Sequence, residues 1–202
     1  MFRRFQIAFV LALITIGSAA VSAQELAVEL NPAQTRVDFT LGDVLHTVHG
    51  DFQLKSGFLR LDEQNGAASG QLTVDATSGE SGSKGRDRKM HQQVLESARF
   101  PDIIFQPQRV VGHVATSGDS QLQIDGLMIM HGQTHEIVAT GPVHINGNEV
   151  SADLHFVVPY PQWGMKNPST LFLRVSNDVE ITVHAVGRLT ATTTARTSAP
   201  PR

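Results

Sequence analysis

Histidine is the residue type in this sequence with the widest chemical repertoire, because its ring can bind a metal ion or transfer a proton near neutral pH. The 202-residue chain carries nine histidines and no cysteine. The lack of cysteine excludes disulfides, thiolate metal sites and a cysteine nucleophile. Any metal site would therefore be built from histidine, methionine and carboxylate side chains.

One pair of histidines has a spacing that suits a metal ion. His131 and His135 flank a predicted hairpin turn, and Met130 beside them offers a soft ligand for copper or nickel. His46 and His49 are three residues apart, which on a strand directs their side chains to opposite faces. The spacing yields no set of three or four ligands, so we predict no intrinsic metal site. A periplasmic metal-handling or stress-response protein that uses its surface histidine and methionine residues is the alternative function.

The sequence lacks the motifs of the common enzyme classes. It has no Gly-x-Ser-x-Gly elbow, no His-Glu-x-x-His, no phosphate-binding loop and no dinucleotide fingerprint. Asp87 and His91 are four apart on a predicted helix and could act as an acid–base couple, but such pairs are common on the polar face of a helix. We predict no catalytic residue and no cofactor. An enzyme acting on a lipid would need a site assembled from distant strands.

Most of the elements that must position these residues are strands. Apolar and polar residues alternate in segments 35–41, 120–131, 149–158 and 178–189, as half-buried strands require. Asn146-Gly147 predicts a hairpin turn between two strands. Regular hairpins at this spacing are typical of a β-barrel or a β-sandwich.

Residues 86–98 interrupt this alternation with helical spacing. Asp87 is the predicted N-cap, and the helix should end before Pro101. The apolar stripe of this helix consists of Met90, Val94, Leu95 and Ala98. A single amphipathic helix in a β chain must cover an apolar surface, and the mouth of a barrel provides one. We therefore predict an all-β fold, an antiparallel barrel with one helical insertion.

Four sequence blocks, taken in order, resemble the YceI-like family of secreted polyisoprenoid-binding proteins. The blocks are VDFTLGDVLHTVHGDFQLKSGFLRLD, RDRKMHQQVLESARFPDIIF, LQIDGLMIMHGQTHEI and PYPQWGMKNPSTLFLRVSNDVEI. The resemblance covers residues 26–189. It implies an extended lipocalin-like barrel whose interior holds a long amphiphile, such as an isoprenoid chain or a fatty amide.

Apolar side chains on the inward faces of the strands and on the helix stripe are the predicted lipid contacts. Met128 and Met130 are flexible fillers that can adapt to a hydrocarbon chain. Trp163 lies in the Pro-rich loop 160–170, which is predicted to gate or line the cavity, with an ordinary packed loop as the alternative. Alternation does not distinguish a hollow interior from a solid core, so a solid core is the alternative. The predicted lipid-binding residues are Val37, Phe39, Phe52, Val74, Met90, Val94, Leu95, Phe105, Leu122, Ile124, Met128, Met130, Leu154, Phe156, Trp163, Val179 and Ile181.

The two ends of the chain differ from its middle. Arg3 and Arg4 precede the apolar run 5–16, and Val21-Ser22-Ala23 ends in a small-x-small pattern, which together predict a cleaved signal peptide over residues 1–23. The apolar run is too short for a comfortable membrane span. Residues 24–189 form the predicted barrel domain, periplasmic in a Gram-negative source. Residues 190–202 contain no large apolar residue and are predicted to be a disordered tail.

The charge of the chain limits its partners. A formal net charge of −3 argues against nucleic acid, and we interpret the basic residues between Lys84 and Lys89 as the solvated side of the helix. The predicted function is non-catalytic binding, sequestration or transport of a long-chain isoprenoid or related fatty lipid, without stable membrane insertion. The sequence does not decide whether the protein forms a homodimer.

Overall fold

Antiparallel strands make up most of the part of the chain that the computed structural model describes, which is residues 22–43, 47–169 and 174–195. In chain order the strands are β1 (Ser22–Leu30), β2 (Arg36–Asp43), β3 (Thr47–Asp62), β4 (Ala68–Asp75), β5 (Asp102–Val111), β6 (Gly118–Met130), β7 (Gln133–Asn146), β8 (Glu149–Val158) and β9 (Val175–Ala195). Between β4 and β5 lie a 3₁₀ turn (Ala76–Ser78), the helix α1 (Lys84–Lys89) and a π-helical turn (Met90–Val94). None of these helices is long and apolar enough to cross a membrane.

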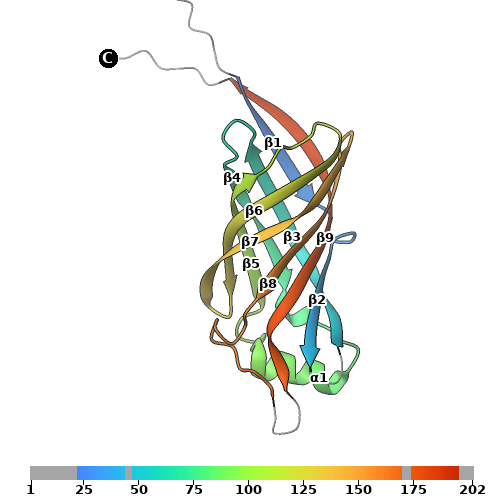
Figure 1. The fold of residues 1–202 in the computed structure, drawn as a ribbon, viewed down its shortest axis with the longest axis vertical. Helices are drawn as coiled ribbons and strands as arrows, with labels where there is room; N and C mark the ends of the chain where they lie inside the picture. The colour runs from blue at the N-terminus through green and yellow to red at the C-terminus, as the bar shows by residue number, and fades with distance from the viewer. Residues whose placement is uncertain (1–21, 44–46, 170–173, 196–202) are drawn as a thin grey trace, which may run out of the picture.

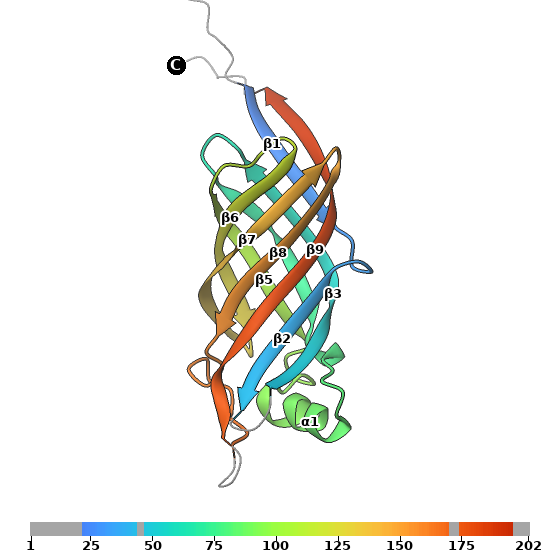
Figure 2. The same ribbon diagram turned by 45° about the vertical axis from the view of Figure 1, so that its right-hand side comes forward.

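The sheet closes on itself. Its strand order is β1-β3-β2-β9-β8-β7-β6-β5-β4, and β4 also pairs with β3. β1 and β2 follow one another between the same two neighbours, β3 and β9, so they share one position around the circumference. Nine strands thus give an eight-position barrel, a size whose interior is filled by side chains or holds one small ligand. Figure 1 and Figure 2 show the elongated antiparallel barrel, and the predicted fold class is confirmed.

The loop between β1 and β2 stays attached to β9 through hydrogen bonds to one residue. Asn31 N donates to Val186 O at 2.8 Å, and Thr35 Oγ1 accepts from Val186 N at 3.1 Å. Thr35 is itself buried, with 6% of its surface exposed. These bonds keep β1 and β2 aligned along β9 despite the break between them.

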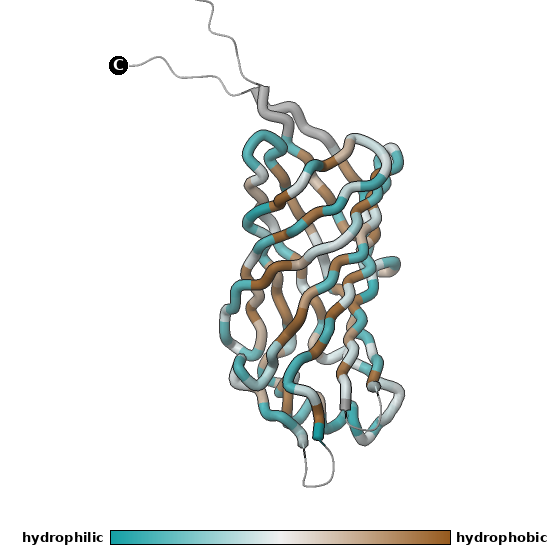
Figure 3. Tube along the Cα trace, viewed as in Figure 1, coloured by the Kyte–Doolittle hydropathy of each residue, from teal (hydrophilic) through white to brown (hydrophobic). Residues whose placement is uncertain are grey.

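Alternation along the strands places apolar side chains inside the barrel, as the sequence predicts. In β7, Ile137, Ala139, Gly141, Val143 and Ile145 are buried while the residues between them are exposed. Figure 3 shows apolar and polar positions alternating along the strands. β8 has the predicted bounds of residues 149–158, and β6 covers nearly all of the predicted segment 120–131.

The helical insertion differs from the predicted single helix over residues 86–98. The α-helix begins at Lys84, after Ser83, and widens into a π-turn in which Leu95 N donates to Met90 O at 2.9 Å. Asp87 is therefore not the N-cap, and its carboxylate instead accepts hydrogen bonds from the amide and hydroxyl of Ser81. Glu96 has a φ of 47°, which ends the helical stretch.

The end of the sheet also differs from the prediction. β9 continues past Leu189 to Ala195 and pairs there with β1, so residues 190–195 are not a disordered tail. The strand persists because the backbone of β1 supplies hydrogen-bond partners that need no apolar side chains. Residues 1–21, which hold most of the predicted signal peptide, and residues 196–202 lie outside the described residues.

Candidate lipid-binding cavity

The barrel encloses a cavity of about 200 Å³, which we call the inner lobe. Every described residue that lines it is Leu, Val, Ile, Phe, Met or Ala, so its wall offers no polar side chain. The predicted lipid contacts that line it are Val37, Phe52, Val74, Phe105, Leu122, Ile124, Met128, Met130, Leu154, Phe156 and Ile181. Such a wall favours a hydrocarbon ligand and offers a polar group nothing in place of water.

The burial of the large side chains shows that this interior is hollow. Phe52, Leu122 and Met128 face inward, yet each keeps 6–7% of its surface exposed. No large side chain in the described ranges falls below 2% exposure. A close-packed core would bring several of them to zero. The alternative of a solid core is therefore wrong for this barrel.

A second cavity of about 450 Å³, the outer lobe, lies at the end of the barrel that carries α1. Phe52, Met130, Val158 and Ile181 line both lobes and so mark the boundary between them. The predicted lipid contacts that line the outer lobe are Phe39, Phe52, Met90, Val94, Leu95, Met130, Val179 and Ile181. An elongated ligand could therefore run from one lobe into the other along the barrel axis.

The helical insertion supplies one wall of the outer lobe. Met90 and Val94 are half-buried against the core and Leu95 is buried, with 7% of its surface exposed. The His91 ring fixes this wall, because its nitrogens lie 2.9 Å from Gly79 O and 3.0 Å from Ser97 Oγ. Three residues of the predicted stripe thus face the cavity, although they are built on a π-turn, whereas Ala98 is exposed and lines neither lobe.

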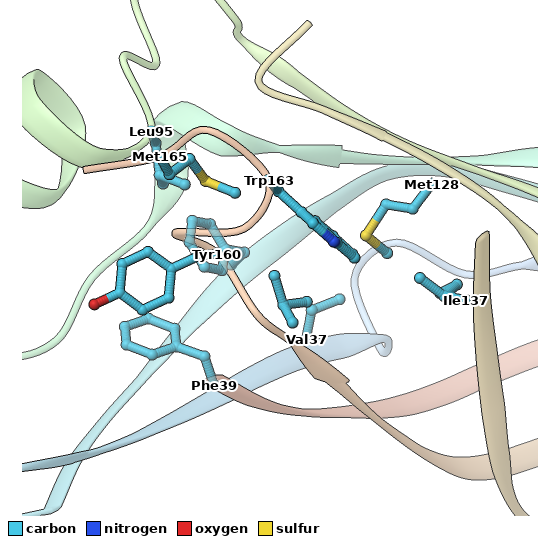
Figure 4. Close-up of a cluster of buried hydrophobic side chains, with 10 residues drawn as sticks. Val37, Phe39, Leu95, Met128, Ile137, Tyr160, Trp163 and Met165 are labelled. Atoms are coloured by element: carbon cyan, nitrogen blue, oxygen red, sulfur yellow. The ribbon is translucent and has the colours of Figure 1, made fainter. Parts of the chain in front are cut away.

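Trp163 is placed outside both lobes, although it was predicted to line the cavity. The loop after β8 turns tightly, with Met165 N donating to Tyr160 O at 3.1 Å. Tyr160 and Met165 point into the outer lobe, while the Trp163 ring lies toward Met128 and Ile137 (Figure 4). Trp163 therefore packs beside Met128 and Ile137 without lining either lobe.

Tyr160 is a cavity residue that the sequence did not single out. Only 3% of its surface is exposed, and its hydroxyl donates to Ser176 O at 2.9 Å. Burial raises the pKa of Tyr160 to about 12, so the ring stays neutral at physiological pH. Met165 and Leu54 also line the cavity and were not among the residues predicted from the sequence. Leu54 follows Phe52 by two and carried a usable alternation signal, whereas the loop positions of Tyr160 and Met165 carry none.

The charged side chains that line the cavity in the described ranges lie at one place. The outer lobe is lined by Arg86 and Lys89, both exposed, and by the half-buried Ser81. Arg86 is anchored on Ser81, with Nε 2.7 Å from Ser81 Oγ and Nη2 2.7 Å from Ser81 O. The cavity is thus apolar at its inner end and basic where α1 meets solvent.

The histidines do not form the metal site considered from the sequence. His131 Nε2 lies 3.4 Å from Glu96 Oε1, and the His131 ring packs on Phe100. His135 stacks on Trp163, and its burial lowers its pKa. Over the described ranges no group of three or more histidine, aspartate or glutamate side chains has a metal-binding arrangement. The metal-handling alternative therefore gains no support.

The Asp87 and His91 pair, which we considered as an acid–base couple but did not predict to be catalytic, has other partners in the structure. The Asp87 carboxylate is occupied by Ser81, and the His91 ring by Gly79 and Ser97. Neither side chain is among those that line the two lobes. This arrangement makes both residues structural supports of the insertion.

Solved structures share this barrel. BcnA from Burkholderia cenocepacia matches with a TM-score of 0.63 and 16% identity, over 78% of this chain and 98% of its own. A polyisoprenoid-binding domain from Saccharophagus degradans, implicated in plant cell wall breakdown, matches with a TM-score of 0.63 and 13% identity, over 81% of this chain and 98% of its own. The YceI protein of Campylobacter jejuni matches with a TM-score of 0.55 and 16% identity, over 71% of this chain and 86% of its own. At these identities the likeness is one of fold.

The sequence itself carries the family assignment. No relative is found among curated proteins by sequence comparison. The family model of the YceI-like domain, however, matches residues 29–187, a span that includes all strands of the closed barrel except most of β1 and the end of β9. As its four sequence blocks predict, the chain belongs to the YceI-like family.

Proposed function

We propose that the protein binds a long-chain isoprenoid or a related amphiphilic lipid inside the barrel and sequesters or transports it without chemical change. The observation that carries this proposal is the inner lobe, whose wall is formed by apolar side chains alone. The Saccharophagus degradans domain that shares the fold is a polyisoprenoid-binding domain, which agrees with this ligand class.

Burial of the hydrocarbon chain supplies the binding free energy. Each buried methylene contributes roughly 0.8 kcal/mol, so a chain of about ten buried methylenes would gain roughly 8 kcal/mol before the cost of association. Such a gain requires no directional polar contact along the chain. Met128 and Met130, at the inner lobe and the lobe boundary, can adjust their rotamers to chains of different shape.

The proposal includes the cellular setting. We infer that residues 1–23 direct export, that cleavage leaves a chain beginning at Gln24, and that the barrel acts in the periplasm. β1 begins at Ser22, so this cleavage removes the two residues that pair with Ala195 and Thr194 at the tip of the sheet. Mass spectrometry of the exported protein tests the cleavage position directly.

Native mass spectrometry of the full chain expressed with export in a Gram-negative host tests the proposed function. We expect a stoichiometric adduct whose organic extract contains an isoprenoid or long-chain lipid. Met128→Trp should reduce this adduct because the added ring fills the inner lobe. Val138→Trp is the matched control, since Val138 lies on β7 with half of its surface exposed and faces outward.

The outcomes separate the alternatives. A folded protein that carries no lipid and takes none up would contradict the proposal. An unchanged lipid load in a folded Met128→Trp variant would show that the ligand lies elsewhere. Circular dichroism melts of both variants establish that each is folded, because overpacking can cost about 1–3 kcal/mol. The same native spectra report the number of chains in the assembly.

A further inference from the structure

The two lobes of the cavity differ in chemistry. None of the described side chains that line the inner lobe is polar, so a ligand's head group cannot exchange its hydration for contacts with them. The outer lobe is lined by Ser81, Arg86 and Lys89, and none of the described side chains that line it is acidic. A bound amphiphile would therefore place its tail in the inner lobe and its head beside α1.

The basic groups at the outer lobe are arranged to receive a negative charge. Arg86 is held in place by its two bonds to Ser81, and a guanidinium has five N–H donors, so donors remain for a ligand. Lys89 Nζ has no hydrogen bond or ion pair to any residue in the described part of the chain. The nearby Asp87 carboxylate is turned toward Ser81 and does not line the lobe.

The local charge opposes the charge of the whole protein. Residues 84–89 contain Lys84, Arg86, Arg88 and Lys89 against the single acid Asp87, a local balance of four positive charges minus one negative, in a chain of net charge −3. A basic rim on an acidic protein favours an anionic ligand group over a neutral one at that position. Arginine and lysine together suit carboxylate and phosphate oxygens.

We propose that the outer lobe recognises an anionic head group, a carboxylate or a phosphate, on the long-chain ligand, with Arg86 and Lys89 as its charge partners. This inference rests on the proposed function, since it concerns the same cavity. It adds a ligand-binding role to two residues that are exposed on the solvated side of the helix, as the sequence predicts. Arg88, on the same helix but outside the lobe lining, takes no part in recognition.

The test uses pairs of ligands that share a chain and differ in head group. The delipidated protein is titrated calorimetrically at low salt with oleate against oleyl alcohol, and with farnesyl phosphate against farnesol, all below their aggregation concentrations and without vesicles. We expect the anion of at least one pair to bind about 5- to 10-fold tighter than its alcohol, as two partly exposed ion pairs supply. The pair that shows this preference identifies the head group.

Three variants locate the preference. Lys89→Gln should reduce it at least about threefold, and Arg86→Gln combined with Lys89→Gln should abolish it while the alcohols bind as before. Arg88→Gln is the matched control and should keep the full preference. Added salt should weaken the anions alone, because screening acts on the charge pairs.

Other outcomes would overturn the inference. Equal binding of acid and alcohol in both pairs would refute it and leave the proposed function intact. If Arg88→Gln lost the preference for the anion to the same extent, the preference would depend on net charge and not on Arg86 and Lys89. An effect of Lys89→Gln seen only on uptake from anionic vesicles would assign the basic residues to membrane docking. Binding of neither acid nor alcohol would refute the proposed function as well.

Discussion

The imidazole of His135 and the indole of Trp163 lie face to face, with ring centroids 4.1 Å apart and 3° between their planes. This stack joins β7 to the loop that follows β8, and the Trp163 ring lies toward Met128 and Ile137 (Figure 4). His135 Nε2 is buried and has no hydrogen-bond partner in the described ranges. The stack therefore depends on a neutral histidine ring.

The stability of the protein should fall when His135 becomes protonated. Burial lowers the pKa of His135 below its ordinary value of about 6.5, so between the two values the unfolded chain binds more protons than the folded one. The free energy of unfolding should therefore decrease as the pH drops below about 6.5 and level off below the folded pKa. Urea denaturation between about pH 8 and pH 5 measures this slope, which His135→Phe should reduce.

His155→Gln is the control for that measurement. His155 is exposed on β8 and contacts Thr182 Oγ1, so its replacement should leave the slope unchanged. A slope that stays the same in His135→Phe would assign the acid sensitivity to other groups.

The depth of the inner lobe should set the length of chain that binds. Ala152 lines the inner lobe and packs against the hydrophobic cluster remote from α1. Ala152→Phe should weaken binding of a 20-carbon prenyl alcohol by about tenfold or more, because roughly two methylenes would lose their place, and should spare a 10-carbon one. Competition between the two alcohols, followed by native mass spectrometry, measures both effects. Ser151→Phe, on the outer face of the same strand, should change neither.

Close backbone approach at Gly50 should make this position intolerant of a side chain. A Cβ there would lie 2.2 Å from Glu80 O and 2.4 Å from the Phe39 ring, whereas a Cβ at Gly42 would meet nothing within 4 Å. Gly50→Ala should therefore lower the free energy of unfolding by about 2–3 kcal/mol. Gly42→Ala should leave it unchanged or slightly higher. Equal effects in urea melts would refute the steric explanation.

The residue that ends the helical insertion should prefer glycine. Glu96 has a φ of 47°, a conformation that costs a residue with a Cβ roughly 1–2 kcal/mol. Glu96→Gly should raise the free energy of unfolding by about 0.5–1 kcal/mol, after the extra flexibility of the unfolded chain is subtracted. Its exposed ion pair with Arg99, at 3.7 Å, contributes little. Glu96→Ala should not raise the free energy of unfolding. A similar gain in that variant would show that the loss of the carboxylate, and not the relief of the positive φ, stabilises the protein.

Side-chain alternation let the sequence predict which residues face inward. Leu122, Ile124 and Met128 on β6 were assigned to one face and line the inner lobe. This succeeds because the period of a strand is two, so one buried position determines the facing of the others. The apolar stripe of the insertion was predicted in the same way from the helical period of 3.6 residues, and Met90 and Leu95 do face the cavity.

The sequence prediction failed where contacts between distant segments determine the local structure. The insertion widens into a π-turn at Met90, where the His91 ring reaches Gly79, and helical periodicity says nothing of that contact. Trp163 leaves the cavity because His135 on another strand offers a stacking partner. β9 extends to Ala195 because β1 lies beside it.

The sequence by itself determined the β-rich class, the inward faces, the family and the presence of one amphipathic insertion, because these depend on local periods and residue types. Only the tertiary structure decided that the interior is hollow and divided into an apolar inner lobe and a basic outer lobe. Alternation settles the direction of each side chain, whereas the space between opposite walls depends on how many strands close the barrel. Two strands sharing one position, β1 and β2, make that number eight.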